Sequence, residues 1–418
     1  MLLEIRLTNF YSINEEISLD LCAANLKSKK TKGLSNRVFE VNGINLLKYV
    51  GIYGSNASGK TNIIKTIRFC CSLILDSGNH HQTSIFNFKP FKFLKEAKPS
   101  VFLIRFLIDE IEYEYSFSLL NNQIHTESLF YYPKGRRAKI FVREEELSSD
   151  KMKKYSFGKS ISHPEEVVRN TSNKNLFITR ASQMDREIGE KIHSFFASHL
   201  ILNYQYRFTA QHIMSIFKEY KPYILEGMQA ADIDITDIKV EVEKRPAKNF
   251  EMNLGHEPTV TVEGVQQEFL RIVTYHKGLA QDFDFNQEES LGTQKLFWIL
   301  LRLYDILKNN KILIIDEIET SLHPKLVEYI LELFNESEGA QLIFTTHNTN
   351  LLDLEKLRKD QVWFVNKKEN GASDLYSLYD YNDFRDTLNL EKAYLQGRFN
   401  AVPIISWERP TVPKKNLA

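Results

Sequence analysis

One eight-residue segment constrains the fold of this 418-residue chain more than any other. It follows the apolar run 46–53 and precedes apolar residues that recur at helical spacing from position 63 onward. The segment is a full G-x4-G-K-[ST] P-loop, and its residues are Gly54, Ser55, Asn56, Ala57, Ser58, Gly59, Lys60 and Thr61. Because a P-loop joins a buried parallel strand to a helix, the sequence predicts an α/β fold around it.

The residue types of this loop suit the phosphates of a nucleotide. Glycines let backbone N–H groups close around phosphate oxygens, and the following helix N-terminus adds a favourable dipole. We expect Lys60 to reach the β- and γ-phosphates of ATP and the Thr61 hydroxyl to bind Mg²⁺. The alternative is an accidental glycine-rich turn, but Lys-Thr after the second glycine has no packing rationale. All eight residues are therefore predicted to bind nucleotide.

A second apolar run ends in two carboxylates. Residues 312–315 are four consecutive aliphatic residues, typical of a strand buried on both faces, and Asp316 and Glu317 follow them. Open α/β sheets bind ligands at the carboxyl ends of their strands. We predict that Asp316 holds Mg²⁺ and that Glu317 activates the attacking water as general base. Without the P-loop this pair would be a solvated turn, whereas with it the Walker B interpretation is favoured.

Two further segments narrow the kind of P-loop protein. The buried run 341–346 ends at His347, which resembles the switch histidine of ATP-binding-cassette ATPases, although a histidine there is more often a structural hydrogen-bonder. Upstream of the carboxylates, Ser290 and Gly292 resemble the cassette signature, which contacts the γ-phosphate held by the opposite subunit. Ser290 alone would equally be the N-cap of the helix that follows. The order and spacing of the segments favour the functional interpretation.

Composition excludes several classes of protein. The chain has 54 basic and 54 acidic residues, so it is not a broadly basic nucleic-acid coat. Its three cysteines, two of them adjacent, argue against a disulfide framework and against a CxxC metal site. The charged first residues lack the apolar core of a signal peptide, and no window is long and apolar enough to span a membrane. We expect a cytoplasmic protein without a membrane partner.

Residue periodicity predicts the organisation of the chain. Alternating residues predict strands near the start and antiparallel strands over 100–142, while 144–172 is expected to be irregular. Helical spacing covers about 175–231, strands return near 238–242 and 259–262, and an α/β pattern begins near 281. The predicted parts are an N-terminal ATPase lobe with a β subdomain (1–143), a helical insertion (144–235), a C-terminal ATPase lobe (236–405) and a tail (406–418).

The ordered set of P-loop, signature, Walker B pair, D-loop segment 319–324 and switch histidine resembles the RecF/SMC branch of the cassette ATPases. Segment 7–12 looks like the first strand and turn of that branch, with Tyr11 in place of the usual basic residue. The similarity is closer to the bacterial AAA-type group that includes RloA-like and AbiL-like ATPases. The segments similar to recurring segments of that group are 90–93, 289–293, 360–365 and 394–403.

This resemblance implies several expectations that spacing does not give. The fold would be a P-loop ABC-ATPase head with an antiparallel β lobe and a helical insertion. The active site would need the P-loop and the signature of different subunits, so the chain would form at least a homodimer. Many such ATPases are encoded with a toxic protein, often a nuclease, in anti-phage or abortive-infection systems. We therefore expect an ATP-driven switch that controls a separately encoded effector.

Two other functions stay open on sequence grounds. One is a DNA-repair or DNA-end-binding ATPase, with nucleic acid as the direct ligand. Three basic clusters, at 27–32, 134–139 and 151–154, could bind phosphates, although such clusters are more often solvated loops. The aromatic residues Tyr204, Tyr206 and Phe208 could stack on bases, although core packing is their commoner use. The other is a transporter's cassette subunit, which the long separation of P-loop and signature disfavours.

Overall fold

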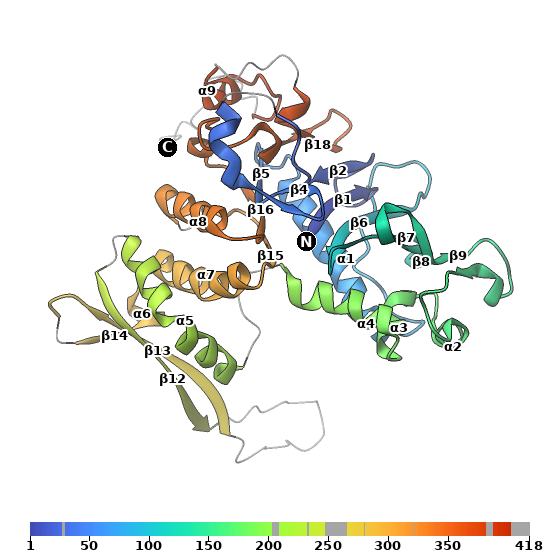
Figure 1. Cartoon of the computed structure of the whole chain (residues 1–418), viewed down its shortest axis with the longest axis horizontal. Helices are drawn as coiled ribbons and strands as arrows, with labels where there is room; N and C mark the ends of the chain where they lie inside the picture. Colours follow the sequence, from blue (N-terminus) through green and yellow to red (C-terminus); the bar gives the residue numbers. More distant parts are fainter. Residues whose placement is uncertain are drawn as a thin grey trace, which may run out of the picture.

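The centre of the molecule consists of two β-sheets and one helix (Figure 1). The helix lies in a hydrophobic core to which both sheets contribute. The computed structural model describes residues 1–26, 30–202, 209–231, 234–246, 266–279, 281–320, 322–381 and 388–402. Within these ranges the chain combines a mainly parallel sheet with an antiparallel one. The fold is therefore the mixed α/β fold with an antiparallel lobe that the sequence predicts.

The mainly parallel sheet has six strands in the described ranges, and β5 lies near its middle. In spatial order its strands are β11 (Leu200–Ile201), β15 (Ile312–Ile315), β16 (Gln341–Thr346), β5 (Tyr49–Gly54), β17 (Val362–Lys367) and β18 (Ser373–Ser377). All neighbours are parallel except β17 and β18. Alternate residues of β15 join different hydrophobic cores, so both faces of this sheet are covered.

The antiparallel sheet has seven strands in the part of the chain that is described. In spatial order these are β10 (Tyr155–Phe157), β9 (Ala138–Glu144), β8 (Gln123–Tyr131), β7 (Ile111–Leu120), β6 (Ser100–Ile108), β1 (Leu2–Thr8) and β2 (Ile17–Asp20). Its apolar face packs on α1 (Lys60–Asp76), whose buried side chains belong to the same core. Helix α1 thus shares a core with residues of both sheets.

The remaining helices divide between two cores (Figure 1). Helices α2 (Pro164–Asn170), α3 (Phe177–Gln183) and α4 (Glu187–Ser194) pack in the core of α1 and the antiparallel sheet. The second core lies on the other face of the parallel sheet, and its helices are α5 (Ala210–Ala230), α6 (Phe285–Glu288), α7 (Leu291–Lys308), α8 (Pro324–Glu336) and α9 (Leu390–Leu395). The helices expected at 175–231 therefore belong to two different cores.

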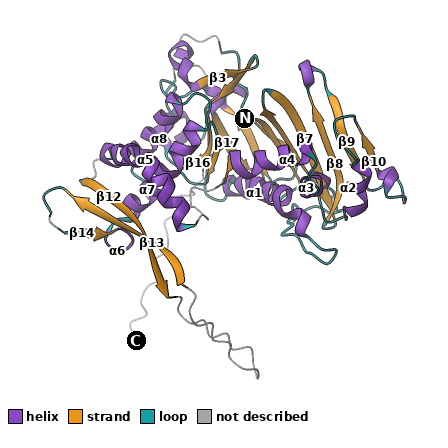
Figure 2. Cartoon of the chain, turned by 60° about the horizontal axis from the view of Figure 1, so that its bottom comes forward, coloured by secondary structure: helices purple, strands orange, loops and turns teal. Residues whose placement is uncertain are grey.

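Two smaller sheets complete the described fold. Strands β12 (Ile235–Pro246), β13 (Gln266–His276) and β14 (Asp282–Asp284) form an antiparallel sheet that packs beside α5 and projects away from the body (Figure 2). Strands β3 (Val38–Val41) and β4 (Ile44–Leu47) form a hairpin. No helix in the described ranges combines the length and apolarity needed to cross a membrane.

The structure differs from the sequence prediction in two segments. Segment 144–172, expected to be irregular, contains β10 and α2, because β10 pairs with the edge strand β9 and Pro164 suits the first turn of α2. The stretch 25–37, which its polar composition rich in Lys and Ser predicts to be a loop, contains a 3₁₀ helix over Lys30–Arg37. The strand expected at 259–262, the aromatic residues at 204–208 and the tail 406–418 lie outside the described residues.

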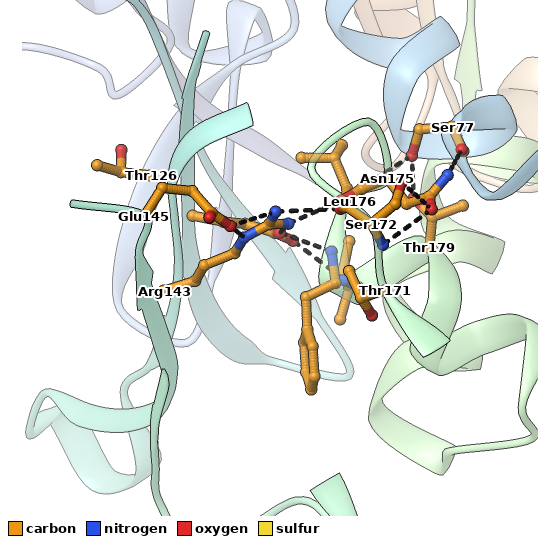
Figure 3. A network of polar contacts seen from close by, with 12 residues as sticks. Ser77, Thr126, Arg143, Glu145, Thr171, Ser172, Asn175, Leu176 and Thr179 are labelled. Carbon is orange, nitrogen blue, oxygen red and sulfur yellow. Dashed lines mark hydrogen bonds and ion pairs between the residues drawn. The ribbon is translucent and has the colours of Figure 1, made fainter. Parts of the chain in front are cut away.

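A buried polar network holds the C-terminal end of α1 (Figure 3). The Asn175 side chain donates to the carbonyl of Ser77, directly after α1, at 2.5 Å, and Thr179 donates to the carbonyl of Ile74 at 2.7 Å. Arg143 on β9 donates to the carbonyl of Asn175 at 2.7 Å. Through these bonds the antiparallel sheet and the start of α3 fix the end of the P-loop helix.

The network contains an ion pair that is almost fully removed from water. A nitrogen of Arg143 lies 3.6 Å from Glu127, and their side chains are 1% and 0% exposed. Glu127 also accepts the backbone N–H groups of Phe177 and Ile178 at 2.6 and 3.0 Å, at the N-terminus of α3. Burial raises the pKa of Glu127, against the opposing effects of Arg143 and these hydrogen bonds. Arg143 also pairs with Glu145 at 2.6 Å, so loss of Arg143, rather than loss of Glu127, would leave a buried partner without its counter-charge.

We predict that Arg143→Met lowers the free energy of unfolding by about 3–5 kcal/mol, because it leaves Glu127 buried without its cation. The matched control is Lys356→Met, which removes a cation from a pair with Glu328 whose side chains are 50% and 38% exposed. Its expected cost is at most about 1 kcal/mol. Urea denaturation followed by circular dichroism measures both. Equal costs for the two variants would contradict the role given to the network.

Candidate nucleotide site

The predicted functional segments meet at one edge of the parallel sheet. Strand β5 pairs in parallel with β16, and β16 pairs in parallel with β15, so their carboxyl ends lie side by side. The P-loop follows β5, His347 follows β16, and Asp316 and Glu317 follow β15. The order of the strands therefore brings these three segments together, although they are distant in the sequence.

The P-loop curls around the ammonium group of its own lysine. Lys60 Nζ donates to the carbonyl oxygens of Gly54 and Ser55 at 2.8 and 3.1 Å. Ala57 has a φ of 61° and Gly59, the N-cap of α1, a φ of 118°, so both residues are in the left-handed region. Burial lowers the pKa of Lys60 to about 8, although the nearby carboxylates act in the opposite direction. Phosphate oxygens would provide Lys60 with the anionic partner that its carbonyl contacts do not.

Two serines from opposite ends of the chain support the loop from behind. Ser373 Oγ donates to the carbonyl of Ser58 at 2.6 Å and lies within hydrogen-bond distance of Ser12 Oγ at 2.7 Å. Asn62 Nδ2 on α1 donates to the same Ser12 oxygen at 2.9 Å. These three residues are not among the predicted site residues, because nothing in local spacing indicates that positions 12 and 373 meet. They fix the position of the loop against the first turn of the chain and strand β18.

A threonine hydroxyl connects the Asp316 carboxylate with the backbone N–H of Glu317. Thr345 Oγ1, at the end of β16, donates to Asp316 Oδ1 at 2.6 Å and accepts the N–H of Glu317 at 2.7 Å. Glu317 has a φ of 50°, and its side chain is exposed. Thr61 Oγ1 lies 3.4 Å from Asp316 Oδ1. This arrangement turns Asp316 toward the P-loop and leaves the Glu317 carboxylate accessible to water.

The donor set fits magnesium. Mg²⁺ prefers oxygen ligands and is commonly held by one or two protein groups together with waters and substrate phosphates. The Thr61 hydroxyl and the Asp316 carboxylate are two such oxygens on neighbouring elements. Within the described residues no group of three or more His, Cys, Asp and Glu side chains could hold a metal ion by itself.

His347 is held at its backbone by Glu319, the first residue of the segment 319–324 that resembles a D-loop. Its N–H donates to Glu319 Oε1 at 2.5 Å, and the second Glu319 oxygen is buried with no hydrogen-bond partner in the part of the chain that the structure describes. Partial burial and the nearby ammonium of Lys60 lower the pKa of His347, which favours the neutral ring. Lys295 on α7 donates to the carbonyls of Ile318 and Thr320, which flank Glu319.

The signature segment lies at the exposed start of α7. Ser290 is the N-cap of α7 and accepts the N–H of Thr293 at 3.1 Å, so it has the structural capping role that the sequence offered as the alternative to a signature serine. Leu291 is 74% exposed, and neither Ser290 nor Gly292 makes a hydrogen bond with the P-loop among the described residues. The preceding Glu289 accepts from His276 on β13 at 2.7 Å. The segment therefore faces outward, available to another molecule.

Comparison with protein families agrees with this geometry. Residues 50–353, from β5 to just beyond His347, match the family described as "AAA domain, putative AbiEii toxin, Type IV TA system". The chain belongs to this family. The matched range contains the P-loop, the signature segment, the Walker B pair and His347 of this AAA domain. No curated protein matches the sequence significantly.

Solved structures give a more distant likeness. Similar chains include an SmcHead bound to the C-winged helix domain of ScpA. The two sequences are 16% identical, the match covers 94% of this chain and 99% of that chain, and the TM-score is 0.42. The SMC head domain from Thermotoga maritima has 14% identity, coverage of 90% and 98%, and a TM-score of 0.38. A third is an Smc head domain with an extended coiled coil, bound to the C-terminal domain of ScpA derived from Pyrococcus furiosus. It has 15% identity, the match covers 95% of this chain and 98% of that chain, and the TM-score is 0.38.

We predict that Gly59→Ala weakens nucleotide binding by at least about tenfold, since left-handed backbone costs a residue with a Cβ about 1–2 kcal/mol. In addition, that Cβ would lie 1.9 Å from Ser373 Oγ, so the loop must shift. Gly43→Ala is the matched control, because Gly43 has a φ of 79° but no atom lies within 4 Å of the position that its Cβ would take. Binding of a fluorescent ATP analogue by Gly59→Ala at wild-type affinity would contradict the assignment.

Proposed function

We propose that this AAA-domain protein binds and hydrolyses ATP with Mg²⁺. The observation that carries the proposal is the Thr345 hydroxyl, which joins Asp316 to Glu317 opposite the P-loop. Lys60 would bind the β- and γ-phosphates, and Thr61 and Asp316 would hold Mg²⁺. Glu317, exposed beside them, would orient and deprotonate the attacking water, while His347 would contact the γ-phosphate. Bound Mg²⁺ would supply positive charge against the phosphates.

The proposed active form is a dimer of two such chains. Ser290 is exposed, and among the described residues neither it nor Gly292 bonds with the P-loop of its own chain, so both are accessible to a second chain. In a symmetric dimer each signature segment would cover the nucleotide of the other subunit. Binding of ATP would then favour the closed dimer, and hydrolysis would release it, so that nucleotide acts as a conformational switch.

We further propose that the switch serves anti-phage defence in the bacterial cytoplasm. The family description, which refers to a toxin and a toxin–antitoxin system, supports a role in controlling growth or infection. The ATP state would hold or release a separately encoded effector, such as a nuclease, as in the RloA-like and AbiL-like ATPases. Neighbouring genes distinguish this role from DNA repair, because a nuclease-like companion favours defence.

The first test compares wild type with Glu317→Gln and Lys60→Ala. Both variants should lose nearly all ATP turnover, because general-base catalysis and phosphate binding each contribute on the order of 10²-fold or more. Glu317→Gln should still bind ATP, and its mass in solution should double when ATP and Mg²⁺ are added. Lys60→Ala should stay a monomer under the same conditions. Turnover by Glu317→Gln at the wild-type rate would overturn the proposal.

A further inference from the structure

A cavity of about 930 Å³ lies beside the P-loop and outside the catalytic groups described above. Its walls come from Ala57 of the P-loop, the first turn of the chain, the turn after β17 and the loop 86–98. This loop, called the lysine loop below, lies between α1 and β6 in the sequence and contains the Pro-Phe-Lys-Phe segment at 90–93. Of the predicted nucleotide-site residues only Ala57 lines this cavity, and none of Lys60, Thr61, Asp316, Glu317 and His347 does.

The lysine loop places positive charge along one side of the cavity. Lysines occur at every third position of the loop and all line the cavity; they are Lys89, Lys92, Lys95 and Lys98. Lys367 at the end of β17 adds a fifth, and Glu96 is the only acidic residue among the described lining residues. All five lysines are exposed, and Glu96 alone cannot neutralise them. The cavity therefore attracts a ligand with several negative charges.

Aromatic side chains lie among these lysines. Phe93 is 69% exposed at the cavity, an unusual position for a large apolar side chain, and Phe91 supports it edge to face at 5.6 Å. Tyr11 and Phe88 also line the cavity. An exposed ring between cations offers a flat apolar surface on which a nucleobase can stack.

The first turn of the chain holds the lysine loop in place. Asn9 Oδ1 accepts the N–H of Phe91 at 3.0 Å, and Asn9 Nδ2 donates to the carbonyl of Lys98 at 2.7 Å. The N–H of Tyr11 donates to the carbonyl of Lys89 at 2.7 Å. These bonds fix the backbone at both ends of the lysine run, so the segment that carries the charges and rings has a defined position before any ligand binds.

We propose that this cavity binds a single-stranded nucleic acid, with lysines on its phosphates and Phe93 stacked on a base. Cationic grooves combined with aromatic platforms are the physical basis of single-strand binding. The alternative occupant is the base and ribose of the P-loop nucleotide. A nucleoside carries no charge, so it would leave the lysines without partners, whereas successive phosphates of a strand would pair with them.

The same turn connects the cavity to the ATP site. Tyr11 contacts the lysine loop, and the next residue, Ser12, bonds with Asn62 and Ser373 behind the P-loop. A strand that moves the lysine loop would therefore also move the support of the P-loop. Nucleic acid bound here would be positioned to change nucleotide affinity, although its own binding does not depend on ATP turnover.

The test measures fluorescence anisotropy of a labelled single strand of about ten thymidines, a length within the usual site size, at several salt concentrations. Wild type should bind it, with an affinity that falls as salt rises. The double variant Lys92→Gln, Lys95→Gln should reduce the slope of log affinity against log salt by about 1.4, since each lost phosphate contact is worth about 0.7 for single strands. Phe93→Ala should weaken binding at least about fivefold.

Matched controls separate the cavity from general surface charge. Lys134→Gln, Arg136→Gln removes two exposed cations from a different basic cluster and should leave the slope unchanged. Ile85→Ala removes a side chain that is 87% exposed but does not line the cavity, and it should bind as wild type does. Circular dichroism and the unfolding temperature establish that each variant is folded.

Three outcomes would overturn the proposal. The first is that wild type does not bind the strand, and the second is that the lysine variant and its control have equal slopes. In the third, saturating ATP displaces the strand competitively from Glu317→Gln, which would assign the cavity to the base of the P-loop nucleotide. Binding of the strand that persists in saturating ATP, and that needs Lys92, Lys95 and Phe93, would support it.

Discussion

The parallel pairing of β5, β16 and β15 is the constraint on which the site depends. Because the register of β16 aligns with both neighbours, Thr345 lies at the strand end where its hydroxyl reaches Asp316 and the N–H of Glu317. A slip of one residue would turn Thr345 toward the opposite face of the sheet and break both bonds. The hydrophobic side chains on both faces, buried in two separate cores, fix that register. Packing of the sheet therefore determines the geometry of the candidate catalytic groups.

Helix α1 is fixed at both of its ends. Ser12 and Ser373 hold the P-loop at its N-terminus, and the network of Asn175 and the buried Arg143–Glu127 pair holds its C-terminus. The partners at the two ends belong to different parts of the fold, so α1 links the parallel sheet, the antiparallel sheet and α3. A nucleotide that shifts the P-loop would transmit force along this helix. This linkage gives a physical route by which ATP could change the surface presented to a partner protein.

Sequence patterns predicted the elements with local signatures and missed the contacts made over long distances. The P-loop and the strands before Asp316 and His347 have short, directional patterns, and the structure brings them to one sheet edge. No pattern in the sequence connects Ser12 with Ser373, because their meeting depends on how β1, β5 and β18 assemble. Helical spacing likewise found the helices of 175–231 but not their partition between two cores, since periodicity reports a buried face and not what covers it.

The central claim, that two chains share one catalytic site, is tested most directly by mixing two inactive variants. Lys60→Ala removes the P-loop cation and Ser290→Arg blocks the signature segment, so each protein alone should be inactive. If the site is shared, mixed dimers contain one intact site, and the mixture should recover up to about a quarter of wild-type turnover in a symmetric two-chain assembly. If each chain acts alone, mixing will add nothing to the turnover of the separate variants, and the shared-site account will be wrong.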